Sequence, residues 1–208
     1  IIRGNAELLN EEDLNTEQRE CSEAILKNVE QIEQYLQAMR QVIHNEFPEE
    51  KTEILEGKAL SEEFIKKAEE IAAAENIKIS IEKCAGKCKI KGNRKELLRA
   101  WENLVSNAVS YTEKEKGIEV FTEVKEKEGK TFLVAEVSDY GPGFSKEDLL
   151  HGTERFYRGD KSRHGSGHQG LGLFIAFNIA KNQGGSLILK NSEKTEGGQA
   201  QLWLVTEG

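Results

Sequence analysis

The sequence predicts an α+β fold in which helices cover one face of a sheet, preceded by an α-helical hairpin. Three observations support this prediction. In several segments apolar residues recur every three or four positions, the spacing of amphipathic helices. Other segments alternate apolar and polar residues as half-buried strands do, and two of them are separated only by a short turn around Glu128-Gly129. Helices and adjacent strands follow one another in blocks, which is typical of the α+β class.

Length and charge limit the possible functions. A chain of 208 residues is long enough for one well-packed domain with a smaller appendage, or for two small domains. The formal net charge is −8 and 32% of the residues are charged, with both signs interspersed. This surface is typical of a cytosolic protein and argues against a primary role on DNA or anionic lipid. No segment approaches the ~20 apolar residues of a membrane span.

The cysteines predict neither a disulfide framework nor a metal site. There are three of them, which is too few and too scattered for a framework. Cys84 and Cys88 stand in Cys-Ala-Gly-Lys-Cys, but no histidine lies nearby to complete a zinc site. Free thiols are therefore favoured over zinc.

Residues 16–46 predict a long helix with one apolar stripe. Its apolar positions follow in steps of four and three, the spacing of a coiled-coil seam: Cys21, Ile25, Val29, Ile32, Leu36, Met39 and Ile43. A polar turn at residues 10–13 separates this helix from a preceding one, which begins without a cap, so we expect the sequence to be part of a longer protein. We interpret residues 1–47 as part of a hairpin that pairs with a second copy in a homodimer. The alternative is a helix lying on its own domain.

A domain boundary is predicted at Phe47-Pro48, because proline lacks an N–H group and disfavours helix in the residue before it. Residues 48–208 would form the second domain. We expect Ser61 to cap its first helix, which ends near residue 76. Short strands should follow at residues 77–81 and 88–91.

The rest of this domain alternates helices with strands. A helix is predicted for residues 93–112, with Trp101, Leu104, Val105 and Ala108 on its buried side. Strands should cover residues 118–125, 131–138, 187–190 and 201–205. A glycine-rich stretch, residues 139–172, precedes a last helix that ends at Gly184-Gly185.

The 93–112 helix carries the first motif that indicates chemistry. Asn103 and Asn107 lie one turn apart on one face, with Tyr111 a further turn along. Asparagine is a mediocre helix former, so two on one face suggest a role beyond the helix. Their amide oxygens could reach a hydrated cation such as Mg²⁺ that holds a polyphosphate. The alternative is two solvated side chains.

The second motif, Asp139-Tyr140-Gly141-Pro142-Gly143, follows a predicted strand. Gly141 and Gly143 would let the backbone approach a flat ligand closely. A carboxylate at the strand end can accept a hydrogen bond from an exocyclic amine such as that of adenine. The same pattern is also that of a tight turn.

Two further motifs lie within the glycine-rich stretch. Residues 154–163 are basic and aromatic, and could equally be a solvated basic face. Residues 165–173 are rich in glycine and open a helix, where backbone N–H groups and the positive helix end favour phosphate oxygens. Together they have the character of a lid that closes over a triphosphate.

In this order the four motifs resemble the nucleotide-binding boxes of bacterial sensor histidine kinases, and residues 1–9 resemble the sequence after the phosphoacceptor histidine in that family's dimerisation hairpin. The resemblance covers the whole chain. It implies a Bergerat-type α/β sandwich with a mixed sheet, ATP:protein-histidine phosphotransferase activity, and ATP and Mg²⁺ as cofactors. The implied partners are a second copy of the chain and the receiver domain of a response regulator. The implied location is the cytoplasmic part of a membrane-anchored bacterial sensor.

The resemblance also implies roles for individual residues. Asn107 would ligate Mg²⁺ with Asn103 in the same shell, and both would act in catalysis with Arg158. Tyr111 would flank the adenine and Asp139 would bind its amino group. Phe156 would anchor the lid. The other implied nucleotide-binding residues are Gly141, Gly143, Lys161, Arg163, Gly170, Leu171, Gly172 and Leu173.

The sequence departs from the family pattern in several places. Ser110 stands where a basic residue is usual, His168-Gln169 replaces paired glycines, and Gln199-Ala200 stands where a threonine is usual. None of the four histidines, His44, His151, His164 and His168, lies in a His-Glu-x-x-x-Pro setting. By the family pattern the phosphoacceptor would lie upstream of Ile1.

Two other functions are weighed against this one. ATPases of the chaperone, gyrase or mismatch-repair type share the implied fold but usually carry a glutamate where Asn103 stands. Glu102 is one residue away and would point elsewhere on the helix. A non-catalytic dimerisation and docking module is the other alternative, and four intact motifs argue against a decayed site.

Overall fold

The computed structural model describes residues 15, 18–19, 21–26, 28–29, 52–82, 86–159 and 170–207. The chain divides into two compact units, Ile1–Phe47 and Pro48–Gly208. In the first unit the described residues 21–26 are helical, and Ile25 of the predicted stripe is 44% exposed. Positions 32–43 of that stripe lie outside the described residues, so the hairpin and its pairing stay predictions.

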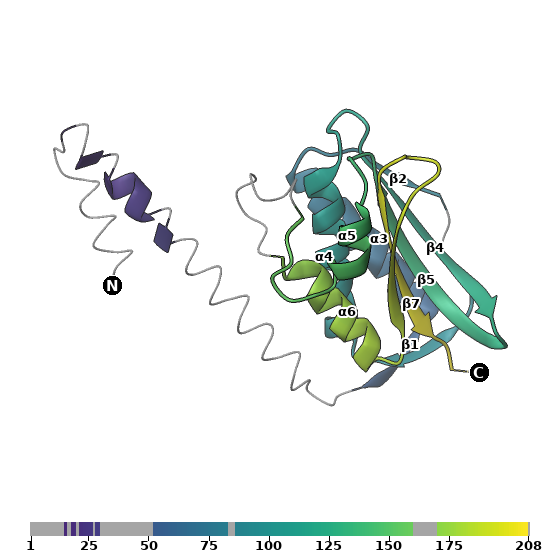
Figure 1. The fold of residues 1–208 in the computed structure, drawn as a ribbon. Helices are drawn as coiled ribbons and strands as arrows, with labels where there is room; N and C mark the ends of the chain where they lie inside the picture. Colours follow the sequence, from purple (N-terminus) through teal and green to yellow (C-terminus); the bar gives the residue numbers. More distant parts are fainter. Residues whose placement is uncertain are drawn as a thin grey trace. The chain divides into compact units, whose positions relative to one another are not determined.

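The second unit is built on a five-stranded mixed sheet with the order β2-β4-β5-β7-β6 (Figure 1). Its strands are β2 (Ile79–Ile81), β4 (Ile118–Lys127), β5 (Lys130–Asp139), β6 (Ser186–Asn191) and β7 (Gly198–Val205). β2 runs parallel to β4, and the other neighbours are antiparallel. The helices α3 (Gly57–Ala74), α4 (Arg94–Tyr111) and α6 (Gly172–Asn182) lie on one face (Figure 1). The predicted α+β class, with a mixed sheet covered on one face, is confirmed.

The core forms between the helices and alternate residues of the central strands. Leu133, Ala135 and Val137 of β5 lie opposite Leu204, Leu202 and Ala200 of β7, and all are buried. The predicted buried side of α4, from Trp101 to Ala108, is buried as expected. The Trp101 ring stacks on Phe64 of α3 with centroids 5.3 Å apart, and its Nε1 donates to the Phe64 carbonyl at 2.7 Å. This packing fixes α4 against α3.

The predicted start of the first helix was wrong. Ser61 does not cap α3, which begins at Gly57, and its hydroxyl instead donates to the Gly57 carbonyl at 2.8 Å. The N–H of Gly57 donates to the Cys88 carbonyl at 2.7 Å, so a neighbouring segment satisfies this helix end. A Cβ on Gly57 would lie 2.1 Å from the Cys88 sulfur, which explains the glycine.

Two elements were not predicted. β1 (Glu53–Glu56) pairs antiparallel with β3 (Lys89–Gly92) in a separate two-stranded sheet. α5 (Lys146–His151) lies inside the glycine-rich stretch, where Ser145 and Asp148 form a capping box. The turn between β4 and β5 is as predicted, because Glu128 and Gly129 both have positive φ. Across the described ranges no helix is long and apolar enough to span a bilayer.

Candidate functional site

One face of α4 presents three predicted site residues. Asn103, Asn107 and Tyr111 are all half-buried and follow one another at intervals of one turn. The Asn103 Nδ2 donates to the Arg99 carbonyl at 2.8 Å, which leaves its Oδ1 as an acceptor. No hydrogen bond among the described residues uses the Asn107 amide. At about 1.5 Å per residue, this face extends about 12 Å from Asn103 to Tyr111.

Asp139 lies at the end of β5 and is only 5% exposed. Its Oδ1 accepts hydrogen bonds from the backbone N–H groups of Gly141 at 2.7 Å and Gly198 at 3.0 Å. Burial raises the pKa of the Asp139 carboxyl, and the two N–H donors oppose that rise without cancelling it. No described residue donates to Oδ2, so this oxygen has an unused hydrogen-bonding capacity within the described part of the chain.

Glycines are required where three segments meet around Asp139. A Cβ on Gly141 would lie 2.3 Å from the Tyr111 carbonyl oxygen, at the end of α4. A Cβ on Gly198 would lie 2.7 Å from Asp139 Oδ2 and 3.0 Å from the Phe144 ring. The structure therefore brings the predicted site residues Tyr111, Asp139 and Gly141 together. Gly198 joins them and was not predicted as a site residue, although its position in a Gly-Gly pair was a visible signal.

The loop that contains Gly143 is held by a residue that sequence reasoning missed. The side chain of Asn191, at the end of β6, accepts from the Phe144 N–H at 2.7 Å and donates to the Phe144 carbonyl at 2.9 Å. Gly143 has a φ of +69°, and a Cβ there would lie 2.9 Å from Asn191 Oδ1. Asn191 therefore fixes this loop as a neighbouring strand would, and no local pattern in the sequence signals it.

The start of α6 lies beside the other end of the α4 face. Leu171 precedes the helix and is buried, Gly172 is its first residue, and Leu173 is half-buried. A Cβ on Gly172 would lie 3.2 Å from Asn103 Oδ1, so the two helices approach closely there. The helix has no side-chain cap and no acidic residue in its first turn. Its N–H groups and positive end can therefore receive an anion.

Residues 160–169 lie outside the described part of the chain, and they include the predicted site residues Lys161 and Arg163. The structure describes the flanking residues Phe156, Arg158 and Gly170. Phe156 is 54% exposed, so it is not anchored by burial. A Cβ on Gly170, which has a φ of +68°, would lie 2.3 Å from the Tyr157 carbonyl oxygen. Arg158 is half-buried. Two described parts of the predicted lid thus meet at Tyr157 and Gly170.

Glu102 points away from this face. Its carboxylate lies 3.4 Å from the Lys67 Nζ on α3. This geometry agrees with the prediction that Glu102 points elsewhere on the helix, and it argues against Glu102 as a base for water. The described residues hold no cluster of three or more His, Cys, Asp or Glu side chains that could bind a metal.

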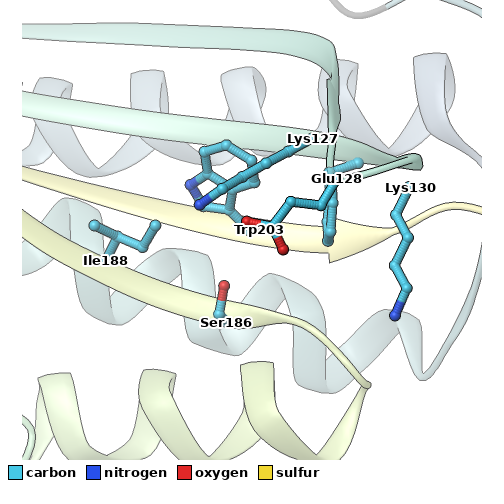
Figure 2. A pocket seen from close by; sticks show the side chains of 7 residues that line it. Lys127, Glu128, Lys130, Ser186, Ile188 and Trp203 are labelled. Carbon is cyan, nitrogen blue, oxygen red and sulfur yellow. The ribbon is translucent and has the colours of Figure 1, made fainter.

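A hollow of about 230 Å³ lies at the far end of the sheet (Figure 2). Its lining residues are Lys127, Glu128, Lys130, Phe132, Ser186, Ile188 and Trp203. Lys130 begins β5 and Asp139 ends it, so the hollow is about 30 Å from Asp139 at about 3.3 Å per residue. It contains none of the predicted site residues, and we do not assign the candidate site to it.

Comparisons with known proteins bear on this arrangement. Residues 92–207 match the family model described as Histidine kinase-, DNA gyrase B-, and HSP90-like ATPase. The chain is 38% identical over 196 residues to Sensor histidine kinase SpaK of Bacillus subtilis, an alignment covering 92% of this chain and 41% of SpaK. It is 43% identical over 82 residues to Signal transduction histidine-protein kinase ArlS of Staphylococcus haemolyticus, covering 39% of this chain and 17% of ArlS. The chain spans less than half the length of these relatives.

Solved structures share the fold. The mycobacterial sensor histidine kinase MprB superposes with a TM-score of 0.61 at 20% identity, covering 74% of this chain and 99% of that one. Full-length ShkA, solved in complex with AMPPNP, gives a TM-score of 0.63 at 20% identity and covers 99% of this chain and 42% of that one. At these identities the likeness concerns the fold alone.

Proposed function

Since this chain belongs to the family of histidine kinase-, DNA gyrase B- and HSP90-like ATPases, we propose that it is the ATP-binding catalytic core of a bacterial sensor histidine kinase. In this role it binds Mg-ATP and transfers the γ-phosphoryl group to a histidine on a dimerisation hairpin. A response-regulator aspartate then receives the phosphoryl group. The names of the relatives SpaK and ArlS support this choice within the family.

The arrangement along α4 is the observation that carries the proposal. At the Tyr111 end, the Asp139 carboxylate keeps one oxygen available for the amino group of adenine. At the Asn103 end, the N-terminus of α6 offers N–H groups to phosphate oxygens. The intervening distance of about 12 Å suits an extended nucleoside triphosphate with its base at one end and its phosphates at the other.

The residues present also fit a magnesium ion held together with phosphates. The described residues offer no carboxylate cluster for a dedicated metal site, while Asn107 has an unused amide and Asn103 an available Oδ1. Mg²⁺ is commonly bound by a few protein oxygens plus substrate phosphates. We propose that Asn107, assisted by Asn103, would hold Mg²⁺, which would neutralise phosphate charge. Arg158, Lys161 and Arg163 would contact the phosphates.

The protein's own contribution to phosphoryl transfer is positioning and electrostatic stabilisation. Tyr111 and Asp139 orient the base, while Asn103 and the start of α6 orient the phosphates. Gly170 and Gly172 permit the close approach of the segments around the triphosphate. In the longer protein, pairing of the 1–47 hairpin with a second copy would present the acceptor histidine, and a receiver domain would dock afterwards.

Replacing Asn107 with Asp tests the proposal. The added negative charge beside the triphosphate should reduce Mg-ATP affinity at least tenfold, measured by isothermal titration calorimetry. The matched control is Asn93→Asp, which makes the same change at the N-cap of α4. Asn93 Oδ1 accepts from the Glu96 N–H at 3.2 Å, and aspartate serves as well there. Equal affinities for the parent and Asn107→Asp would overturn the metal-site assignment, and a parent that binds no ATP would overturn the proposed function.

A further inference from the structure

A charged cluster lies next to Asp139, and Tyr140 is its one member that belongs to a predicted motif. Its members are Glu82 after β2, Glu119 in β4, Tyr140 after β5 and Lys194 between β6 and β7. The Lys194 Nζ lies 2.8 Å from Glu119 Oε2 and also contacts the Glu82 carboxylate. The Tyr140 hydroxyl donates to Glu119 Oε1 at 2.7 Å. We call these residues the Lys194 cluster.

Glu119 is the centre of the Lys194 cluster. Its side chain is only 15% exposed, and each of its carboxylate oxygens has one donor. Burial alone would raise the pKa of Glu119, but the hydrogen bonds from Lys194 and Tyr140 outweigh it and hold that pKa below its usual value. Glu119 is therefore ionised at neutral pH and holds both donors in place.

The two donors of the cluster belong to the two segments that flank Asp139. Tyr140 is the next residue, and its N–H donates to the Thr112 hydroxyl at 3.1 Å. Lys194 lies in the turn that leads to Gly198, whose N–H binds Asp139 Oδ1. That turn is closed internally, because Ser192 N–H donates to the Gly197 carbonyl at 2.9 Å and the Ser192 hydroxyl accepts from Thr195 N–H at 3.1 Å. Displacing either donor would displace a segment that contacts Asp139.

We propose that the Lys194 cluster is a positioning element for Asp139. By tying Tyr140 and the 192–198 turn to Glu119, it fixes the carboxylate oxygen that receives the adenine amine. This inference rests on the proposed function, since it requires Asp139 to bind adenine. Exposed ion pairs add little to global stability, so the expected effect of removing Lys194 is local.

The experiment compares Lys194→Met with Lys67→Met in the 208-residue chain. Lys67 is a matched control because it also bridges two carboxylates, Glu70 at 3.0 Å and Glu102 at 3.4 Å, away from Asp139. Dissociation constants are measured for ATP and for purine riboside triphosphate, which lacks the 6-amino group. Lys194→Met should reduce the affinity for ATP roughly three- to tenfold, a typical size for an indirect coupling. The affinity for the amine-free analogue should stay within about twofold of the parent's. Lys67→Met should change neither, and Lys194→Arg should restore ATP binding.

Two outcomes of the binding measurements would overturn the positioning role. One is an equal loss of affinity for ATP and for its amine-free analogue in Lys194→Met, which would indicate a general loosening of the site. The other is an unchanged ATP affinity. Amide hydrogen exchange gives a readout without nucleotide: Lys194→Met should speed exchange at Gly198 and Gly141, whose N–H groups bind Asp139, and unchanged rates would contradict the proposal. A parent that binds no adenine nucleotide would overturn the proposed function, while the exchange rates would still decide whether the Lys194 cluster holds Asp139.

Discussion

The buried Asp139 carboxylate destabilises the fold, and the same feature suits it to bind a ligand in the proposed site. Its carboxylate is buried, yet described residues donate only to one of its two oxygens. A buried group with an unused hydrogen-bonding atom destabilises a protein, and such groups are concentrated where ligands bind. The raised pKa of Asp139 has the same cause, because burial destabilises the ionised carboxylate.

Asp139→Asn should therefore separate stability from binding. Asparagine keeps the acceptor for Gly141 and Gly198 but removes the buried charge, so the variant should be at least as stable as the parent at neutral pH. It should bind ATP more weakly by about 1–3 kcal/mol, the range for a hydrogen bond to a charged group, and GTP should not lose affinity. Calorimetry and thermal denaturation measure the two effects. Equal losses for ATP and GTP would mean that Asp139 is structural.

The stability difference between Asp139→Asn and the parent should depend on pH, and the direction of the Asp139 pKa shift says how. The folded-state pKa of Asp139 lies above the usual value of 3.8, so the folded protein binds this proton more tightly than the unfolded chain. The ionised parent is destabilised at neutral pH, and that cost disappears as pH falls through the folded pKa. The stability advantage of Asp139→Asn should shrink over the same interval, as measured by denaturant titrations at neutral and acidic pH. An advantage that grows on acidification would contradict the assignment.

At the scale of elements, the site depends on close contacts between the end of α4, the loop after β5 and the start of β7. These contacts leave no room for side chains at Gly141 and Gly198. Sequence could predict α4 and the β4–β5 hairpin, because the helical periodicity and the Glu128-Gly129 turn are local signals. It could not predict that Gly57 starts α3 on the Cys88 carbonyl or that Asn191 holds Phe144, because those contacts join distant segments.

Gly141→Ala should therefore damage both the fold and the site. The added methyl group would meet the Tyr111 carbonyl oxygen at 2.3 Å and force the loop away from α4. We expect the free energy of unfolding to fall by about 1–3 kcal/mol, which is typical of overpacking. The ATP affinity should fall by a larger fraction of its parent value. Gly86→Ala is the control, because a Cβ there has no atom within 4 Å. Equal stabilities of both variants in urea denaturation would show that the loop adapts without strain.

At the scale of the whole molecule, the two units are expected to perform separable tasks. The described part of the first unit leaves Ile25 exposed, which a helix that pairs with a second copy would require. Sequence alone predicted a boundary at Phe47-Pro48, where the two compact units meet in the sequence, and the role of the first unit as a dimerisation hairpin stays a prediction.

Ile25→Glu should yield a monomer that still binds ATP. A charge on the predicted seam opposes pairing, whereas the proposed nucleotide-binding residues all lie in the second unit. Light scattering after gel filtration measures the mass, and calorimetry on the same sample measures ATP affinity. The control is Glu23→Gln, at an exposed position outside the stripe. A parallel loss of both properties would show that the units are coupled.

The 208-residue chain should not label itself from γ-labelled ATP. An acceptor imidazole must be presented in line with the γ-phosphate, and none of the four histidines lies in the family's acceptor setting. Adding a hairpin that carries such a histidine should produce an acid-labile, base-stable phosphoprotein. If the chain alone forms that product, one of its own histidines is the acceptor, and His44 on the predicted hairpin is the first to replace.

The contact between Gly170 and Tyr157 has a consequence for how this protein can vary. Tyr157 and Gly170 are in contact, so the segment between them begins and ends at the same place in the domain. The entropy cost of closing a loop grows only slowly with its length. Insertions or deletions between the two residues would therefore leave α6 and the sheet in register. Related chains could therefore differ in the length and sequence of this segment without changes elsewhere in the domain.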